Sequence, residues 1–140
     1  MYAHPVAIRE EKMATSIKEL MAAANAEVPK ISADEARRLI SEEDALMVDV
    51  RDGPEVQASG KIKDALHVSR GMLEFRADAE TPYYNAEFRK DRPIILYCAS
   101  GGRSALSGKT LKDMGYEKVY NLGAFKDWSE SGGAVEKSPA

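Results

Sequence analysis

The fold of this chain is decided by the stretch Pro93-Ile94-Ile95-Leu96-Tyr97-Cys98-Ala99-Ser100-Gly101-Gly102-Arg103-Ser104. Its apolar first half predicts a buried strand, and Pro93 stands at the first position, where the backbone needs no ladder donor. After the loop of residues 99–103, a helical pattern runs over about residues 104–114. Cys98 is therefore predicted to stand at the carboxyl end of a strand, directly before a helix.

Apolar runs and helical patterns alternate on both sides of this stretch. Further strands are predicted at residues 45–50, 65–68 and 118–122, and further helices at about 33–42, 71–79, 87–90 and 124–130. Strands that alternate with helices predict an α/β domain with a mostly parallel sheet and right-handed crossovers.

Several of these helices have an expected inward face. A capping-box pattern, Ser32 to Glu35, begins the helix over 33–42. The helix over 33–42 is expected to point Ala36, Leu39 and Ile40 into the core. The expected core residues of the helix over 71–79 are Met72, Leu73 and Phe75, and those of the helix over 124–130 are Phe125 and Trp128.

The residues before about position 30 have a different character. Residues 1–14 have no periodic pattern and predict a mobile tail, whereas residues 15–26 predict an amphipathic helix that ends near Pro29. We expect this helix to be an appendage. The chain is accordingly divided into a tail with an appended helix, residues 1–28, and one domain over residues 29–140.

Length and composition limit the classes of function. The chain has 140 residues, of which 44% are hydrophobic and 31% charged, as expected for one soluble globular domain. Its net charge of -3 provides no basic field for nucleic-acid phosphates. No apolar run approaches the roughly 20 residues of a membrane helix, and a signal-peptide core is missing. We therefore expect neither a nucleic-acid nor a membrane partner, and a cytoplasmic location.

The inventory of metal and redox residues is small. One cysteine, Cys98, excludes an internal disulfide, and with only two distant histidines, His4 and His67, the chain does not favour a structural zinc site. We expect no metal and no organic cofactor. Any chemistry of Cys98 is that of a lone thiol.

The loop after Cys98 favours a thiolate. A helix that follows a strand offers unpaired amides and the positive end of its dipole, and Gly101 and Gly102 allow successive amides to face one point. Such surroundings lower a thiol pKa, so Cys98 is predicted to be a nucleophile. Arg103 adds a positive charge and two donors for an anion.

Several motifs in a fixed order resemble those of single-domain rhodaneses, which are sulfurtransferases. The resemblance covers about residues 31–136 and is carried by Val48-Asp-Val-Arg51 with Glu55, Gly60-Lys-Ile62, Ala65-Leu-His-Val68, the Cys98–Ser104 loop, and Asn121-Leu-Gly-Ala-Phe125 with Trp128. It implies a rhodanese-like α/β fold: a five-stranded parallel sheet with helices on both faces, here with an extra N-terminal helix.

The resemblance also implies roles for particular residues. Cys98 would carry the transferred sulfur as a persulfide. The backbone amides around it would bind substrate and persulfide; they belong to Ala99, Ser100, Gly101, Gly102, Arg103 and Ser104. Asp49 and Arg51 would support this loop by hydrogen bonds. The chain departs from the family pattern at Lys61, Asp64, Ser69 and Ala124, where the family often has His, Gly, Pro and Gly.

The expected function is transfer of a sulfane sulfur from a small anionic donor such as thiosulfate, through Cys98, to a nucleophilic acceptor, cyanide in vitro. The acceptor in the cell, a small molecule or a protein, stays open. His67 is expected to be packed rather than to touch substrate, and Lys61, Lys63, Arg70 and Arg76 to form a solvated face.

Two other functions remain open. One is a binding or sensing module without catalysis. The other is a cysteine-dependent phosphatase, but rhodanese-fold phosphatases have their phosphate-binding arginine six positions after the cysteine, where this chain has Ser104, whereas Arg103 stands five positions after it. A cysteine-histidine protease is disfavoured because neither histidine lies in a recognisable motif.

Overall fold

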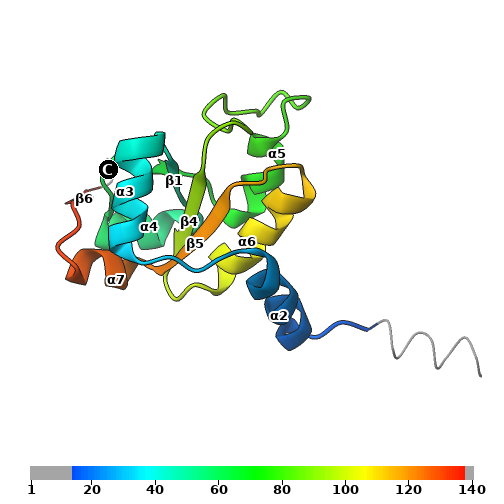
Figure 1. The fold of residues 1–140 in the computed structure, drawn as a ribbon, viewed down its shortest axis with the longest axis horizontal. Coiled ribbons are helices and arrows are strands. Elements are labelled where there is room, and N and C mark those ends of the chain that lie inside the picture. The colour runs from blue at the N-terminus through cyan, green and yellow to red at the C-terminus, as the bar shows by residue number, and fades with distance from the viewer. Residues whose placement is uncertain (1–13, 138–140) are drawn as a thin grey trace, which may run out of the picture.

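The computed structural model describes residues 14–137 (Figure 1). The tail predicted over residues 1–14 lies, except for its last residue, outside them. A parallel sheet forms the centre, with strands in the order β3 (Leu66–His67), β1 (Leu46–Asp49), β4 (Ile94–Cys98) and β5 (Val119–Ala124). The predicted strand at 93–98 and its neighbours are thus confirmed, and the fold is the expected α/β type.

Within residues 14–137, the parallel sheet has four strands rather than the five expected. At the position of the missing strand, one parallel bridge joins Lys30 to Asn121 on β5. Its hydrogen bonds run from the Asn121 N–H to the Pro29 carbonyl and from the Ile31 N–H to the Asn121 carbonyl. Pro29 itself has no N–H to donate, so the segment cannot extend the ladder in that direction.

A second, two-stranded antiparallel sheet, which the sequence did not indicate, pairs β2 (Lys61–Ile62) with β6 (Val135–Glu136). Strands of two residues are too short to show an alternating pattern. The pairing brings the C-terminal segment against the residues that follow α4 (Gly53–Ser59), a helix that was likewise not expected.

Helices cover both faces of the parallel sheet, as the resemblance implies (Figure 1). One face packs on α5 (Leu73–Ala77) and α6 (Gly102–Asp113), and the other on α3 (Ala33–Glu43) and α7 (Phe125–Glu130). Successive side chains of β4 alternate between the two cores: Ile94, Leu96 and Cys98 enter the first, and Ile95 and Tyr97 the second. Because both faces are covered, the whole strand is apolar.

The helix ends follow from local chemistry. The Ser32 side chain accepts from the Glu35 N–H, and the Glu35 carboxylate accepts from the Ser32 N–H, which confirms the predicted capping box. The helix over residues 33–43 buries Ala36 and Leu39, but Ile40 is exposed, so its predicted inward position was wrong.

The segment between β3 and β4 differs most from expectation. In place of a helix over 71–79, a 3₁₀ turn (Arg70–Met72) precedes the short helix α5, and residues 87–90 form turns rather than a helix. Leu73 is buried as expected, whereas Phe75 is exposed and packs edge-to-face on Tyr83. The Asp78 side chain accepts from the Glu80 N–H, so an Asp turn ends this helix early.

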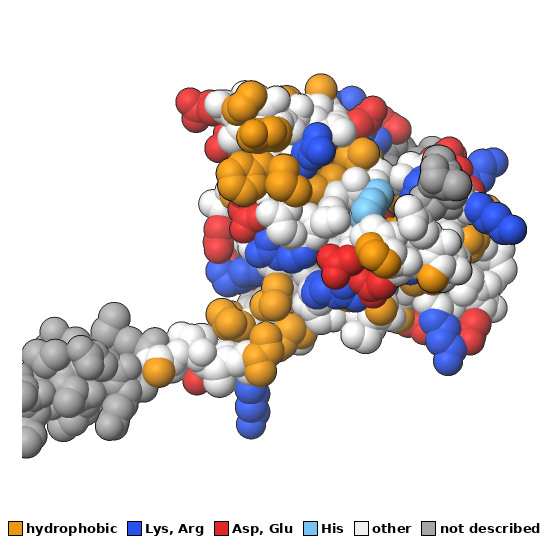
Figure 2. All heavy atoms as spheres, turned by 180° about the vertical axis from the view of Figure 1, so that it is seen from behind, with side chains coloured by type: hydrophobic (Ala, Val, Ile, Leu, Met, Phe, Trp, Pro, Cys, Tyr) orange, Lys and Arg blue, Asp and Glu red, His pale blue; other side chains and the backbone are white. Residues whose placement is uncertain are grey.

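The appended helix is α2 (Ile17–Glu27), capped by Ser16. It packs on α6 through Ala24 and, just after its end, Val28, both of which are buried. Ile17, at 63%, and Leu20 are exposed, Met21 is half-buried, and hydrophobic groups gather over this helix in Figure 2. The division of the chain at residue 28 stays a prediction.

Candidate active site

Cys98 ends β4, and α6 begins four residues later, so the sequence-predicted position of this thiol is correct. The turn between them depends on Gly101, which has φ +103° and whose Cα hydrogen faces Gly123: a Cβ there would lie 3.3 Å from the Gly123 Cα atom. Only glycine adopts this conformation without strain. The turn folds the loop back over the sulfur, and Cys98 is fully buried.

Hydrogen-bond donors surround the Cys98 sulfur. The Gly101 N–H donates to Sγ across 3.0 Å, and the Ser104 Oγ atom lies 3.5 Å from Sγ. The Ser100 and Ser104 amides also face the sulfur. Burial by itself raises the pKa of the Cys98 thiol, but hydrogen bonds to the sulfur, among them those of the Ser104, Gly101 and Ser100 amides, outweigh it and leave that pKa below its ordinary value. The loop therefore favours a thiolate.

Ser104 belongs to a buried polar network. Its hydroxyl donates to the Asn121 Oδ1 atom across 2.7 Å, and the Asn121 amide nitrogen donates to the Gly101 carbonyl across 3.3 Å. In β5, Asn121 lies opposite Leu96, whose side chain points to the same face as Cys98. The sequence predicted Ser104 only as a backbone donor and Asn121 only as part of a motif, so this network was missed.

Arg103 does not present its donors to the sulfur. Its two terminal nitrogens donate to the two carboxylate oxygens of Glu55, across 2.7 Å and 2.9 Å. Glu55 also accepts from the Asp52 N–H at the start of α4. The Arg103 side chain holds the pKa of Glu55 at about 2. The predicted free cation is thus a bidentate ion pair, with its charge largely balanced.

Asp49 and Arg51 form a buried ion pair that faces away from Cys98. Asp49 accepts from the Arg51 backbone and guanidinium and from the Tyr97 hydroxyl, and Arg51 further donates to Ser59 and to the Gly60 carbonyl. Asp49 lies opposite Tyr97 in the sheet, and Tyr97 points to the face that Cys98 does not. Among residues 14–137, the side-chain hydrogen bonds of Asp49 and Arg51 go to these partners and not to the loop after Cys98, so the expected direct support of the loop was wrong.

The remaining sequence candidates lie around this centre. His67 is half-buried with its Nε2 atom 2.7 Å from the Arg51 carbonyl, and Trp128 is buried in the second core, as expected for a packed residue. Lys61 binds Glu136, and Arg70 binds Glu74 and Thr110. These contacts are structural, so neither basic side chain is a simple solvated group.

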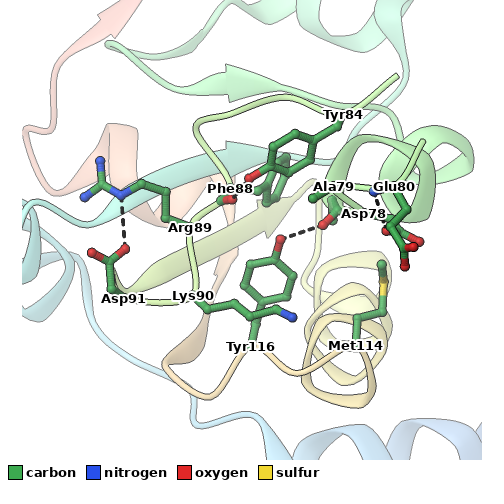
Figure 3. A pocket seen from close by; sticks show the side chains of 11 residues that line it. Asp78, Ala79, Glu80, Tyr84, Phe88, Arg89, Lys90, Asp91, Met114 and Tyr116 are labelled. Carbon is green, nitrogen blue, oxygen red and sulfur yellow. Dashed lines mark hydrogen bonds and ion pairs between the residues drawn. The ribbon is translucent and has the colours of Figure 1, made fainter. Parts of the chain in front are cut away.

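A cavity of about 720 Å³, drawn in Figure 3, lies near the amino ends of strands β4 and β5, opposite to the end that carries Cys98. Asp91 and Lys90, which line it, come just before β4 begins, whereas Cys98 ends that strand. On its floor the Tyr116 hydroxyl donates to the Ala77 carbonyl. This cavity is therefore separate from the thiol.

Among residues 14–137, no three His, Cys, Asp or Glu side chains gather closely enough to hold a metal ion. In the same part of the chain, every helix is too short or too polar to cross a bilayer.

Known proteins share this architecture. A protein of Allochromatium vinosum named sulfurtransferase is 36% identical over 98 residues, which are 69% of this chain and 83% of that protein. A Rhodopseudomonas palustris structure, described as a protein of unknown function and possible tyrosine phosphatase, has a TM-score of 0.80 and 36% identity, covering 89% of this chain and 96% of that one.

The polysulfide-sulfur transferase homodimer of Wolinella succinogenes has a TM-score of 0.67 and 31% identity, covering 84% of this chain and 85% of that one. Its similarity and that of the Allochromatium protein agree with sulfur transfer at the level of the family. Residues 32–131 match the sequence family described as the rhodanese-like domain. The chain therefore belongs to the rhodanese-like domain family.

Proposed function

We propose that this protein is a sulfurtransferase that carries a sulfane sulfur on Cys98. It takes the sulfur from a small anionic donor such as thiosulfate and passes it to a nucleophilic acceptor, for which cyanide serves in vitro. The observation that carries the proposal is the position of the Cys98 Sγ atom. It lies within a tight loop and accepts a hydrogen bond from the Gly101 N–H across 3.0 Å. A sulfur anion in this loop is stabilised without any added cation.

The reaction has two displacement steps. The Cys98 thiolate attacks the outer sulfur of thiosulfate, a new S–S bond forms to Sγ, and the old S–S bond breaks with its electron pair leaving on sulfite. The acceptor then attacks the terminal sulfur of the persulfide, and the electron pair of that S–S bond returns to Sγ. No net oxidation and no proton transfer are needed with thiosulfate and cyanide. The loop amides stabilise negative charge in both steps.

The phosphatase alternative is less well supported. A phosphoryl group in transfer presents three equatorial oxygens and needs donors that grip them. Arg103, the arginine that follows Cys98 in this loop, has both terminal nitrogens on Glu55, and the loop from Cys98 to Arg103 is one residue shorter than the phosphatase loop. Binding phosphate through Arg103 would first require breaking this ion pair. A terminal sulfur needs only the amides.

Intact-protein mass spectrometry tests the proposal directly, because Cys98 is the single thiol of the chain. Thiosulfate should add one sulfur atom to the wild-type protein with release of sulfite, and cyanide should remove it as thiocyanate. Cys98→Ser should gain nothing, and a surface variant such as Lys126→Gln should behave as the wild type. Turnover of an aryl phosphate with no sulfur on Cys98 would establish the phosphatase instead.

If neither thiosulfate nor polysulfide loads Cys98 and no aryl phosphate is turned over, the proposed catalytic function is wrong. The binding-module alternative is then the one that fits, because the fold would be present without its chemistry.

A further inference from the structure

The Ser104 hydroxyl is shared between two buried groups that compete for its single proton. Its oxygen lies 2.7 Å from the Asn121 Oδ1 atom and 3.5 Å from the Cys98 sulfur. Ser104 is fully buried and Asn121 is 4% exposed, so water does not substitute for either partner. A hydroxyl has one hydrogen to donate and two lone pairs that accept.

The direction of these hydrogen bonds is fixed by the Gly101 carbonyl. A carbonyl only accepts, so the Asn121 group that faces it, across 3.3 Å, must be the amide nitrogen. The Asn121 Oδ1 atom therefore faces Ser104, and this oxygen also only accepts. It follows that the Ser104 proton is committed to Asn121 and that Ser104 offers Cys98 a lone pair.

This arrangement suits a thiol and not a thiolate. The Cys98 S–H can donate to the Ser104 oxygen, but a thiolate has no proton and needs donors. Ser104 becomes a donor to the thiolate only if its hydroxyl turns away from Asn121, which leaves a buried amide oxygen without a partner. In the persulfide the charge lies mainly on the terminal sulfur, so Sγ again makes little demand on the hydroxyl.

We propose that Asn121 is a positioning residue that draws the Ser104 hydroxyl away from Cys98 and so favours the thiol and the persulfide over the free thiolate. The effect of Asn121 on turnover rests on the proposed sulfur transfer. The effect of Asn121 on the titration of the Cys98 thiol is independent of that proposal. Asn121 thereby opposes the loop amides and limits how far they stabilise an unloaded thiolate.

Other charges near the sulfur do not explain such an effect. On α6 and α4, Arg103 and Glu55 form their ion pair, and Asp52 adds a further negative charge near Arg103. On β1, Asp49 faces the opposite core with its partner Arg51. Changes at Asn121 leave all of these groups in place. A shift in the titration of Cys98 in Asn121 variants can therefore be assigned to the hydroxyl.

The test is a double-mutant cycle of Asn121→Leu and Ser104→Ala. The pH dependence of thiolate ultraviolet absorbance and of alkylation by iodoacetamide reports Cys98 alone, since the chain has one cysteine. Asn121→Leu should lower the titration midpoint by about one pH unit, the difference between a hydrogen bond to a charged and to a neutral group. Ser104→Ala should also lower the midpoint, because the thiol loses the oxygen that accepts its proton.

The cycle separates positioning from packing. In the Ser104→Ala background, Asn121→Leu should have no effect on the midpoint, whereas a packing effect would shift both backgrounds equally. Asn85→Leu is the matched control: its side chain accepts from the Glu87 N–H in an exposed turn, and its replacement should leave the midpoint unchanged.

A second variant guards against misfolding of Asn121→Leu. Asn121→Asp keeps the acceptor and adds a negative charge, so it should raise the midpoint, opposite in sign to Asn121→Leu. The proposal is overturned if Asn121→Leu leaves or raises the midpoint, if Asn121→Asp lowers it, or if the shift persists without the Ser104 hydroxyl. These readouts need no sulfur donor, so failure of thiosulfate to load Cys98 would refute the proposed function and leave this inference standing.

Discussion

Asp49→Asn is expected to destabilise the fold strongly because it breaks a buried ion pair. Asp49 is fully buried, and Arg51 is 3% exposed. The carboxylate accepts from the Arg51 backbone N–H, from its guanidinium and from the Tyr97 hydroxyl. An asparagine offers one acceptor oxygen, and its amide group would face the same donors. The Arg51 charge would stay buried without a countercharge.

Removing one partner of a buried pair costs about 3–5 kcal/mol. The total stability of a domain is roughly 5–15 kcal/mol, so this loss is a large part of it. At this chain length each kcal/mol corresponds to about 3–4 °C in Tm, which predicts a fall of roughly 10–20 °C. The remaining Arg51 contacts to Ser59 and Gly60 place the cost toward the lower end of this range.

Urea unfolding and thermal melting of both proteins measure the effect. Glu130→Gln is the control, because it removes one partner of an exposed pair with Lys126 and should cost less than about 0.5 kcal/mol. A loss below about 1 kcal/mol for Asp49→Asn would refute the argument. A normal stability combined with failure to load sulfur on Cys98 would instead restore a direct role of Asp49 in the loop.

Two further predictions concern the Glu55 ion pair and the packing of the segment that ends the N-terminal helix on α6. Hydrogen bonding from Arg103 lowers the pKa of Glu55 from 4.5 to about 2. The ion pair therefore stabilises the fold fully above pH 4.5 and loses its effect as the pH falls through 2. The Tm difference between wild type and Glu55→Gln should close over this interval. At neutral pH, titration calorimetry should show severalfold tighter thiosulfate binding by Glu55→Gln, and unchanged affinity would contradict a balanced Arg103 charge. Gly108→Ala should cost about 1–2 kcal/mol in urea unfolding, because its Cβ would lie 2.7 Å from a Val28 methyl group and this clash exceeds the gain in helix propensity. Val28→Ala in the same chain should relieve the clash, and strictly additive losses would show that the two residues do not meet.

Much of the fold could be predicted because it depends on local patterns. The apolar run that ends at Cys98 is long enough to mark a strand, and the glycines after it mark the turn into α6. The Ser32 capping box spans three residues and was confirmed. Elements of two residues, such as β2 and β6, leave no periodic trace and were missed. The expected fifth strand was wrong because one bridge at Lys30 replaces it.

The candidate site was predictable only in part. The position of Cys98 followed from chain order alone, since ligand sites of parallel sheets lie at the carboxyl ends of the strands. The contact of Glu55 with Arg103 joins residues 48 positions apart, and the burial of Asp49 on the opposite face follows from its register with Tyr97. Such contacts depend on which elements become neighbours, and no local pattern encodes that choice.

The burial of Cys98 has a consequence for how the protein behaves in air. A disulfide between two molecules requires the sulfur atoms to approach to about 2.05 Å, with their Cβ atoms about 3.8 Å apart. Cys98 is fully buried, and the Gly101 turn lies over its sulfur, so the folded loops of two copies would collide before their sulfurs could meet. Oxidation in storage should therefore leave the chain free of covalent dimers while it stays folded, and a cross-linked species on a non-reducing gel would mark molecules that have unfolded.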